Sequence, residues 1–105
     1  MTDRLAGKVA LITGGASGLG ANAAALMVQE GGRVVVADIA IDRGKAVADK
    51  LGSAGHFVKL DVTSEDNWKA AIAETVDKFG AIHVLLNSAG IGLSKTVEKD
   101  FRRRA

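Results

Sequence analysis

The stretch TGGASGLG, residues 13–20, decides the fold, because its glycines separate an apolar run from a helix-prone segment. Residues 8–13, KVALIT, are short, apolar and partly β-branched, as in a buried strand. Residues 21–30 predict a helix that ends at the glycine pair 31–32. A strand, a glycine turn and a helix N-terminus in this order offer free N–H groups and a positive dipole, which suit a pyrophosphate.

Each residue type in this turn has a physical reason to be there. Gly14 allows a sharp turn where the chain leaves the strand. Gly18 lets the backbone approach a bulky anion with no Cβ in the way, and Gly20 lets the helix pack close to the sheet. Ser17 adds a hydroxyl donor. The turn is therefore a candidate phosphate cradle.

The same alternation of strand and helix continues along the chain. Further strands are expected at residues 33–38, 56–60 and 82–86, and further helices over residues 41–51 and 64–79. Trp68, Ile72, Val76 and Phe79 form one stripe on the third helix and are expected in the core. Apolar strands separated by helices predict an α/β fold, a Rossmann-type parallel sheet of about four strands with helices on both faces.

An acid follows the second strand at the position that dinucleotide binding requires. Asp38 lies 18 residues after Gly20, where a carboxylate grips the ribose hydroxyls of an adenine dinucleotide. The same charge repels the extra phosphate of NADP, and the neighbours Ala37 and Ile39 carry no positive charge. We therefore expect NAD as the cofactor, with Ile39 beside it.

Composition excludes several classes of protein. The 105 residues suit a single domain, and the absence of Cys excludes disulfides and thiolate metal sites. Without Arg102–Arg104 the charge balance is slightly negative, so a nucleic-acid partner is not expected. The longest apolar run is about six residues, far short of the ~20 needed to span a bilayer, so a membrane partner is not expected either. His56 and His83 have no carboxylate or third ligand at metal spacing, so no metal site is expected. The start of the chain lacks a signal-peptide pattern, which predicts a cytoplasmic location.

Four motifs in order resemble those of the short-chain dehydrogenases/reductases. The glycine turn has the spacing T-G-x-x-x-G-x-G, preceded by LAGKVALIT at residues 5–13. LDVT at residues 60–63 resembles the family's acidic turn, and NSAG at residues 87–90 resembles its N-N-A-G stretch, with Ser88 in place of the second Asn. The resemblance covers residues 5–94. It implies an NAD site built from Gly14, Ser17, Gly18, Leu19, Gly20, Asp38, Ile39, Asp61, Val62, Asn87, Ala89 and Gly90.

The resemblance also implies chemistry that this chain does not contain. The family's acid–base pair is a Tyr with a Lys four residues later, and this sequence has no Tyr. Ser88 and Ser94 do not lie where the family has its catalytic Ser, so no catalytic residue is assigned. Residues 1–105 are expected to be one NAD-binding domain, incomplete at its C-terminus and inactive alone. The complete enzyme, expected to be a homo-oligomer, would interconvert a secondary alcohol and a ketone.

Two alternative functions, neither of them that of a dehydrogenase, remain open for this sequence. A chain that ends at Ala105 would be a non-catalytic nucleotide-binding module, or a half-domain that self-associates through the uncovered edge of its fourth strand. A methyltransferase-type Rossmann domain also uses a glycine loop and an acid after the second strand. The methyltransferase hypothesis does not explain the NSAG stretch at residues 87–90.

Overall fold

The chain forms one parallel sheet with helices packed on both faces. The computed structural model describes residues 4–88. In chain order the elements are β1 (Val9–Thr13), α1 (Gly18–Gln29), β2 (Arg33–Asp38), α2 (Ile41–Lys50), a 3₁₀ turn (Gly52–Ala54), β3 (Gly55–Lys59), α3 (Glu65–Phe79) and β4 (Val84–Asn87). The predicted α/β fold is confirmed.

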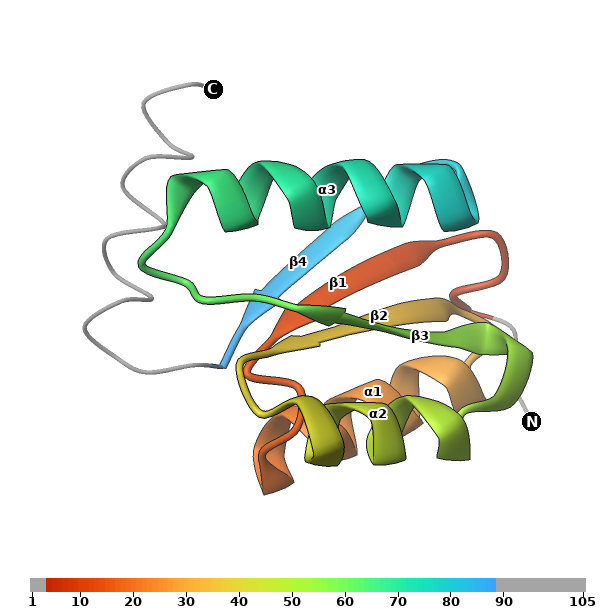
Figure 1. Ribbon diagram of the computed structural model, residues 1–105. Helices are drawn as coiled ribbons and strands as arrows, with labels where there is room; N and C mark the ends of the chain where they lie inside the picture. Colours follow the sequence, from red (N-terminus) through yellow and green to blue (C-terminus); the bar gives the residue numbers. More distant parts are fainter. Residues whose placement is uncertain (1–3, 89–105) are drawn as a thin grey trace.

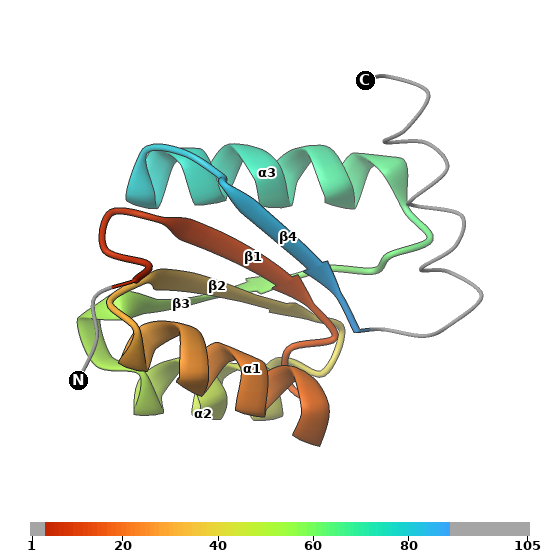
Figure 2. The same ribbon diagram turned by 180° about the vertical axis from the view of Figure 1, so that it is seen from behind.

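The strands lie in the order β3-β2-β1-β4, and each neighbouring pair is parallel. From β1 the chain moves through β2 to β3, and then returns across α3 to the other side of β1. Because crossovers between parallel strands are right-handed, this reversal places α1 and α2 on one face and α3 on the other (Figures 1 and 2). β1 is therefore the switch point, beside which open α/β sheets bind ligands.

Two apolar layers fill the space between the sheet and its helices. Ile12 and Val34 belong to the layer under α1 and α2, whereas Leu11 and Val35 belong to the layer under α3. Successive residues of a strand point to opposite faces, so a strand covered on both sides is apolar throughout. All five residues of β1 are buried for this reason.

Helix α1 begins at Gly18, three residues before the predicted start. The cause is Ser17, whose hydroxyl caps the helix by accepting a hydrogen bond from the Gly20 N–H. The glycines at the end of the motif thus lie inside the first turn of the helix. No helix within residues 4–88 is long and apolar enough to span a membrane.

Strand β4 begins at Val84, two residues later than predicted. The His83 ring explains the difference, because its Nδ1 atom accepts the Val9 N–H at 3.0 Å where the ladder would use a backbone carbonyl. The His83 N–H in turn donates to the Val9 carbonyl at 2.8 Å. His83 thus joins the first residue of β1 to the segment that leads into β4.

Candidate functional site

A cavity of about 330 Å³ opens at the carboxyl ends of the strands. Segments that follow β1, β2, β3 and β4 all contribute to it. Its lining residues are Gly14, Ser17, Asp38, Ile39, Arg43, Leu60, Asp61, Val62 and Ser88. Six of these, all except Arg43, Leu60 and Ser88, are among the predicted cofactor residues. The fold therefore brings together residues that are up to 74 positions apart.

The glycine turn is held in shape by its own hydrogen bonds. Gly14 has a φ of +68°, a left-handed conformation that favours glycine and lets the chain leave β1 sharply. The Ser17 hydroxyl donates to the Gly14 carbonyl at 2.8 Å and accepts the Gly20 N–H at 3.2 Å. Ser17 is thus both a cap of α1 and a polar group on the cavity wall.

Two glycines of the turn lie in opposite surroundings. A Cβ added at Gly18 would have no atom within 4 Å, so the backbone there is open to an incoming group. A Cβ added at Gly20 would collide with the Gly14 carbonyl and lie 2.8 Å from both the Gly15 Cα and the Ser88 hydroxyl. Close packing at Gly20 is therefore against the turn and the end of β4, rather than against the strands themselves.

The first turn of α1 faces outward with unused donors. The N–H groups of Gly18 and Leu19 have no acceptor within residues 4–88, as is usual at a helix start. The Leu19 side chain is 77% exposed. Free N–H groups, the positive helix end and open space at Gly18 together suit a bulky anion such as a pyrophosphate.

Asp38 connects the end of β2 to two neighbouring segments. Its Oδ2 atom accepts the Ala16 N–H at 3.0 Å, and its Oδ1 atom accepts the Ala40 N–H at 2.9 Å. An ionised carboxylate has about four acceptor positions, so further positions remain for hydroxyl groups. Asp38 is half-buried on the cavity wall, where those positions can meet a ribose.

The turn after β3 is fixed by polar contacts around Asp61. The Thr63 hydroxyl and N–H both donate to the Asp61 Oδ1 atom, at 2.6 and 2.9 Å. These bonds, the hydroxyl bond first, hold the pKa of Asp61 below its ordinary value, and the Lys59 charge acts in the same direction. The Asp61 N–H donates to Asn67 Oδ1 at 3.0 Å, and the Trp68 indole donates to the Val62 carbonyl at 2.9 Å.

Sequence reasoning missed the supporting roles of Asn67 and Trp68. The predicted core stripe is only half right: Trp68 and Phe79 pack in the layer under α3, whereas Ile72 and Val76 are 41% and 42% exposed, because the helix turns Ala71 and Thr75 toward the sheet instead. The Trp68 indole N–H also fixes the turn after β3. A polar atom on an otherwise apolar stripe was the available signal, since a buried indole N–H usually finds an acceptor.

The end of β4 is joined to the end of β1. The Thr13 hydroxyl donates to Asn87 Oδ1 at 2.8 Å, and the Ser88 hydroxyl donates to the Thr13 carbonyl at 2.6 Å. Ser88 also contacts the Gly14 carbonyl at 3.2 Å, so it supports the glycine turn directly. The predicted site residues Ala89 and Gly90 lie outside the described residues, as do Ser94 and Arg102–Arg104.

Arg43 is a cavity residue that sequence reasoning did not find. The chain neighbours of Asp38, Ala37 and Ile39, carry no positive charge. Arg43 lies in the first turn of α2, and the helix brings it to the same cavity. The available signal was its position, since the N-terminal turn of the helix after β2 lies at the carboxyl end of the sheet.

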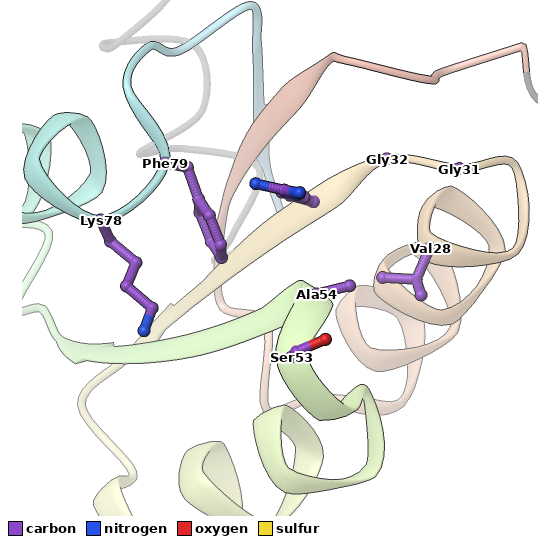
Figure 3. Close-up of a pocket in the computed structure, with 8 residues that line it drawn as sticks. Val28, Gly31, Gly32, Ser53, Ala54, Lys78 and Phe79 are labelled. Carbon is purple, nitrogen blue, oxygen red and sulfur yellow. The ribbon is translucent and has the colours of Figure 1, made fainter.

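A second, larger cavity of about 560 Å³ lies at the amino ends of the strands. Val28, Ser53, Lys78 and Phe79 line it (Figure 3), and the Arg33 guanidinium lies 5.8 Å from the centre of the Phe79 ring. The glycine turn, Asp38, Asp61 and the end of β4 all lie at the opposite end of the sheet. Ligands of open parallel sheets bind at the carboxyl ends, so the smaller cavity is the candidate site.

The expectation that His56 has no carboxylate partner was wrong. His56 Nε2 lies 2.6 Å from Glu74 Oε2, because β3 and α3 bring together residues 18 positions apart. The pair is partly exposed, and no group of three potential ligands surrounds a metal position within the described residues. We interpret the contact as a surface link between the edge strand and α3.

Comparison with known proteins agrees with this geometry. The profile of the short chain dehydrogenase family matches residues 8–104. A 3-alpha-(or 20-beta)-hydroxysteroid dehydrogenase of Mycobacterium tuberculosis is 50% identical over 98 residues, 93% of this chain and 38% of that protein. A 3-beta-hydroxysteroid dehydrogenase of Comamonas testosteroni is 43% identical, over 98% of this chain and 42% of that protein.

A solved structure of a reductase is also similar to this chain. The 3-ketoacyl-(acyl-carrier-protein) reductase of Brucella melitensis, complexed with NADH, matches with a TM-score of 0.76 and 37% identity. The match covers 77% of this chain and 34% of that one.

This chain spans about 38% of the length of the first curated relatives it matches. The family and the NADH-bound neighbour together support a nicotinamide cofactor. The family profile matches residues 8–104, and half of the 98 aligned residues are identical in a curated relative, so the chain belongs to the short-chain dehydrogenase family.

Proposed function

We propose that this chain is the N-terminal NAD(H)-binding part of a short-chain dehydrogenase. The observation that carries the proposal is the position of Asp38, on the wall of the same cavity as the glycine turn. The glycine turn suits the pyrophosphate of an adenosine diphosphate group, and Asp38 suits its ribose hydroxyls. Both line the same cavity. Residues 1–105 would form a single domain of this kind, completed by further chain.

Each part of the coenzyme has residues of matching chemistry. Ser17 and the N–H groups of Gly18 and Leu19 suit the pyrophosphate, with Gly14 and Gly20 shaping the turn. Asp38 and Ile39 suit the adenosine ribose, and Asp61 and Val62 suit the adenine. Ile39 is 61% exposed, so it offers apolar surface to a ligand. By resemblance, Asn87, Ala89 and Gly90 would lie on the nicotinamide side.

The charge of Asp38 supports NAD over NADP. Its oxygens can accept hydrogen bonds from the ribose 2′- and 3′-hydroxyls, whereas a 2′-phosphate would place like charges together. A bound nicotinamide supplies hydride transfer, and the protein orients it. The residues of this chain bind and position; with no Tyr in the sequence, the family's Tyr–Lys pair is absent from it.

The complete enzyme is proposed to interconvert a secondary alcohol and a ketone. Several relatives carry names of ring alcohols, among them hydroxysteroid and trans-4-hydroxycyclohexanecarboxylate dehydrogenases. A ring alcohol is therefore the substrate class to test first in a protein that contains this part. The 105-residue chain alone should bind coenzyme without oxidising cyclohexanol.

Titration of the 105-residue chain with NADH tests the binding proposal, with nucleotide fluorescence as the readout. We expect saturable binding that Asp38→Ala weakens by at least about tenfold, the loss of one hydrogen-bonded charge. Asp42→Ala is the matched control, because Asp42 is an exposed acid four residues later, in the first turn of α2, and does not line the cavity. Equal loss in both variants would contradict the ribose assignment.

A self-associating module is the second candidate, favoured by exposed apolar side chains. Within the described residues β4 pairs on one side only, with β1. Leu26 of α1 and Ile72 and Val76 of α3 are 61%, 41% and 42% exposed. Sedimentation at micromolar concentration separates the candidates: a dimer of the 105-residue chain that does not bind NADH would favour this one.

A further inference from the structure

The larger cavity, at the amino ends of the strands, has no part in the proposed coenzyme site. Its volume of about 560 Å³ lies within the range of about 300–1,000 Å³ that is usual for small-molecule sites. The end of α1, the 3₁₀ turn and the end of α3 contribute to it (Figure 3). Val28 packs on the α1 side of the sheet and Phe79 on the α3 side, so the cavity extends over the start of β2 from one face to the other.

Among the residues that the structure describes, two cations and no acid line this cavity. The cations are Arg33, the first residue of β2, and Lys78, in the last turn of α3. Neither makes an ion pair within residues 4–88. Of the acids next to lining residues in sequence, Glu30 contacts Arg4 at 3.8 Å and Asp77 is exposed, and neither lines the cavity. Two positive charges are therefore left for an anion.

A helix-end effect explains Lys78 but not Arg33. A cation in the last turn of a helix offsets the negative end of the helix dipole. Arg33 begins a strand instead, and its guanidinium lies over the Phe79 ring, 5.8 Å from the ring centre. The attraction between a cation and the face of a ring holds the guanidinium at the cavity. This contact does not use the N–H groups as hydrogen-bond donors to oxygen, so they remain for a ligand.

A hydroxyl and three apolar side chains complete the lining. Ser53 belongs to the 3₁₀ turn, and its hydroxyl forms no hydrogen bond with any other residue of the described part of the chain. The side chains of Val28, Ala54 and Phe79 are half-buried and offer apolar surface. The cavity thus combines three polar donor groups with an apolar wall.

We propose that this cavity binds a small organic phosphate, a phosphate monoester with an apolar body. Its guanidinium, ammonium and hydroxyl groups match the three free oxygens of a monoester, and its two cations match the charge of about −1.5 to −2 at neutral pH. A carboxylate, with two oxygens and one charge, would use fewer of these donors. The apolar wall suits the organic part. This site does not depend on the proposed function, because the coenzyme cavity lies at the opposite ends of the strands.

A second site at the amino ends is compatible with ligand binding at the carboxyl ends of open parallel sheets. Anions bind at the carboxyl ends because helix N-termini present free backbone N–H groups there. At the amino ends, the N–H groups of Gly31 and Gly32 already donate to the carbonyls of Val28 and Met27, at 3.0 and 2.9 Å. The donors of the second site are therefore side chains, which substitution can remove one at a time.

Titration of the ¹⁵N-labelled 105-residue chain with phenyl phosphate tests the proposal, with amide chemical shifts as the readout. Phenyl phosphate carries a phosphate monoester on an apolar ring. We expect saturable shifts centred on residues 31–33 and 53–54. Shifts at Gly18 or Leu19 would report binding at the coenzyme turn, and they are fitted separately, so the two sites are distinguished residue by residue. Benzoate, which has the same ring and a single carboxylate, should bind at least about threefold more weakly at the amino end.

Three variants that each remove one positive charge identify the groups that bind. Arg33→Gln and Lys78→Gln should each raise the dissociation constant of phenyl phosphate at the amino end by about twofold to fivefold at low salt, as for one exposed charge pair. Lys45→Gln is the matched control, because Lys45 is an exposed cation of α2 that lines neither cavity. It should leave the constant unchanged. The effects should shrink at about 1 M salt, where the screening length is about 3 Å. The amide spectrum of each variant shows directly whether it folds.

Shifts at the amino end that do not begin to saturate by about 10 mM phenyl phosphate would overturn the proposal. Equal weakening in all three variants would also overturn it, because binding would then follow net charge rather than the cavity. Benzoate that binds as tightly as phenyl phosphate would overturn the choice of a phosphate. A chain that binds phenyl phosphate at the amino end but not NADH would contradict the proposed function alone.

Discussion

The carboxylate of Asp38 accepts a hydrogen bond from the backbone N–H of Ala16, 3.0 Å away in the glycine turn. Its other oxygen accepts the Ala40 N–H, at the start of α2. The residue proposed to bind the ribose therefore also fixes the turn proposed to bind the pyrophosphate. Any change at Asp38 should alter both parts of the coenzyme site.

The first prediction follows from this double role. Asp38→Ala should free the Ala16 N–H, and its amide hydrogen exchange should rise at least about tenfold, the factor that corresponds to about 1.4 kcal/mol. Hydrogen bonds to a charged group contribute about 1.5–3 kcal/mol, so the free energy of unfolding should fall by about that amount. Exchange by NMR and urea unfolding measure the two effects. Unchanged exchange at Ala16 would show that the carboxylate does not hold the turn.

A second prediction separates packing from binding within the glycine turn. Gly20→Ala places a methyl group against backbone atoms of Gly14 and Gly15, so we expect a loss of about 1–3 kcal/mol of stability. Gly18→Ala places the same group in open space and should leave the midpoint of urea unfolding nearly unchanged. The second variant should nevertheless weaken NADH binding, because its Cβ enters the space assigned to the pyrophosphate.

Each variant of the pair serves as the control for the other. They make the same chemical change two residues apart in the first turn of α1. If Gly18→Ala binds NADH as tightly as the wild-type chain, the pyrophosphate does not approach the backbone there. If Gly20→Ala is as stable as the wild-type chain, the turn is more adaptable than its contacts indicate.

The fold could be predicted because its signals are local. Each strand is an apolar run, and each helix has a polar cap or a glycine stop, as at Ser64 and Gly80 of α3. These patterns depend on residues a few positions apart, so periodicity and caps are enough to find them. The starts that differ from the prediction by more than one residue, at Gly18 and Val84, are those where a side chain takes the place of a backbone hydrogen-bond partner.

The parts of the site that escaped prediction depend on distant contacts. The glycine turn and Asp38 could be found because they follow a known spacing. Arg43 and the His56–Glu74 contact depend on how helices lie against the sheet, which no local pattern encodes. Residues that position a site are therefore harder to read from one sequence than residues that form it.

A third prediction concerns the two histidines, whose contacts differ in kind. His83→Leu removes the acceptor of the Val9 N–H at the start of β1, and an unsatisfied amide costs about 1–3 kcal/mol of stability. His56→Leu removes one partner of a partly exposed pair, for which we expect about 0–1 kcal/mol. Urea unfolding at neutral pH measures both. A larger loss from the His56 variant would contradict the role given to His83.

The last prediction uses the pH dependence of Asp61. Its pKa lies below the ordinary value of 3.8 in the folded chain, chiefly because the Thr63 hydroxyl donates to it. A carboxyl with a lowered pKa contributes stability above its unfolded value, and that contribution is lost as pH falls through the folded pKa. Thr63→Val should raise the pKa of Asp61, lower stability at neutral pH and have little effect once Asp61 is protonated. Thr63→Ser keeps the hydroxyl and should keep the low pKa, which carboxyl NMR titration can follow. If the Val and Ser variants titrate alike, the backbone N–H of Thr63 and the charge of Lys59 would be enough to set the pKa, and the side chain of Thr63 would have another role in the turn.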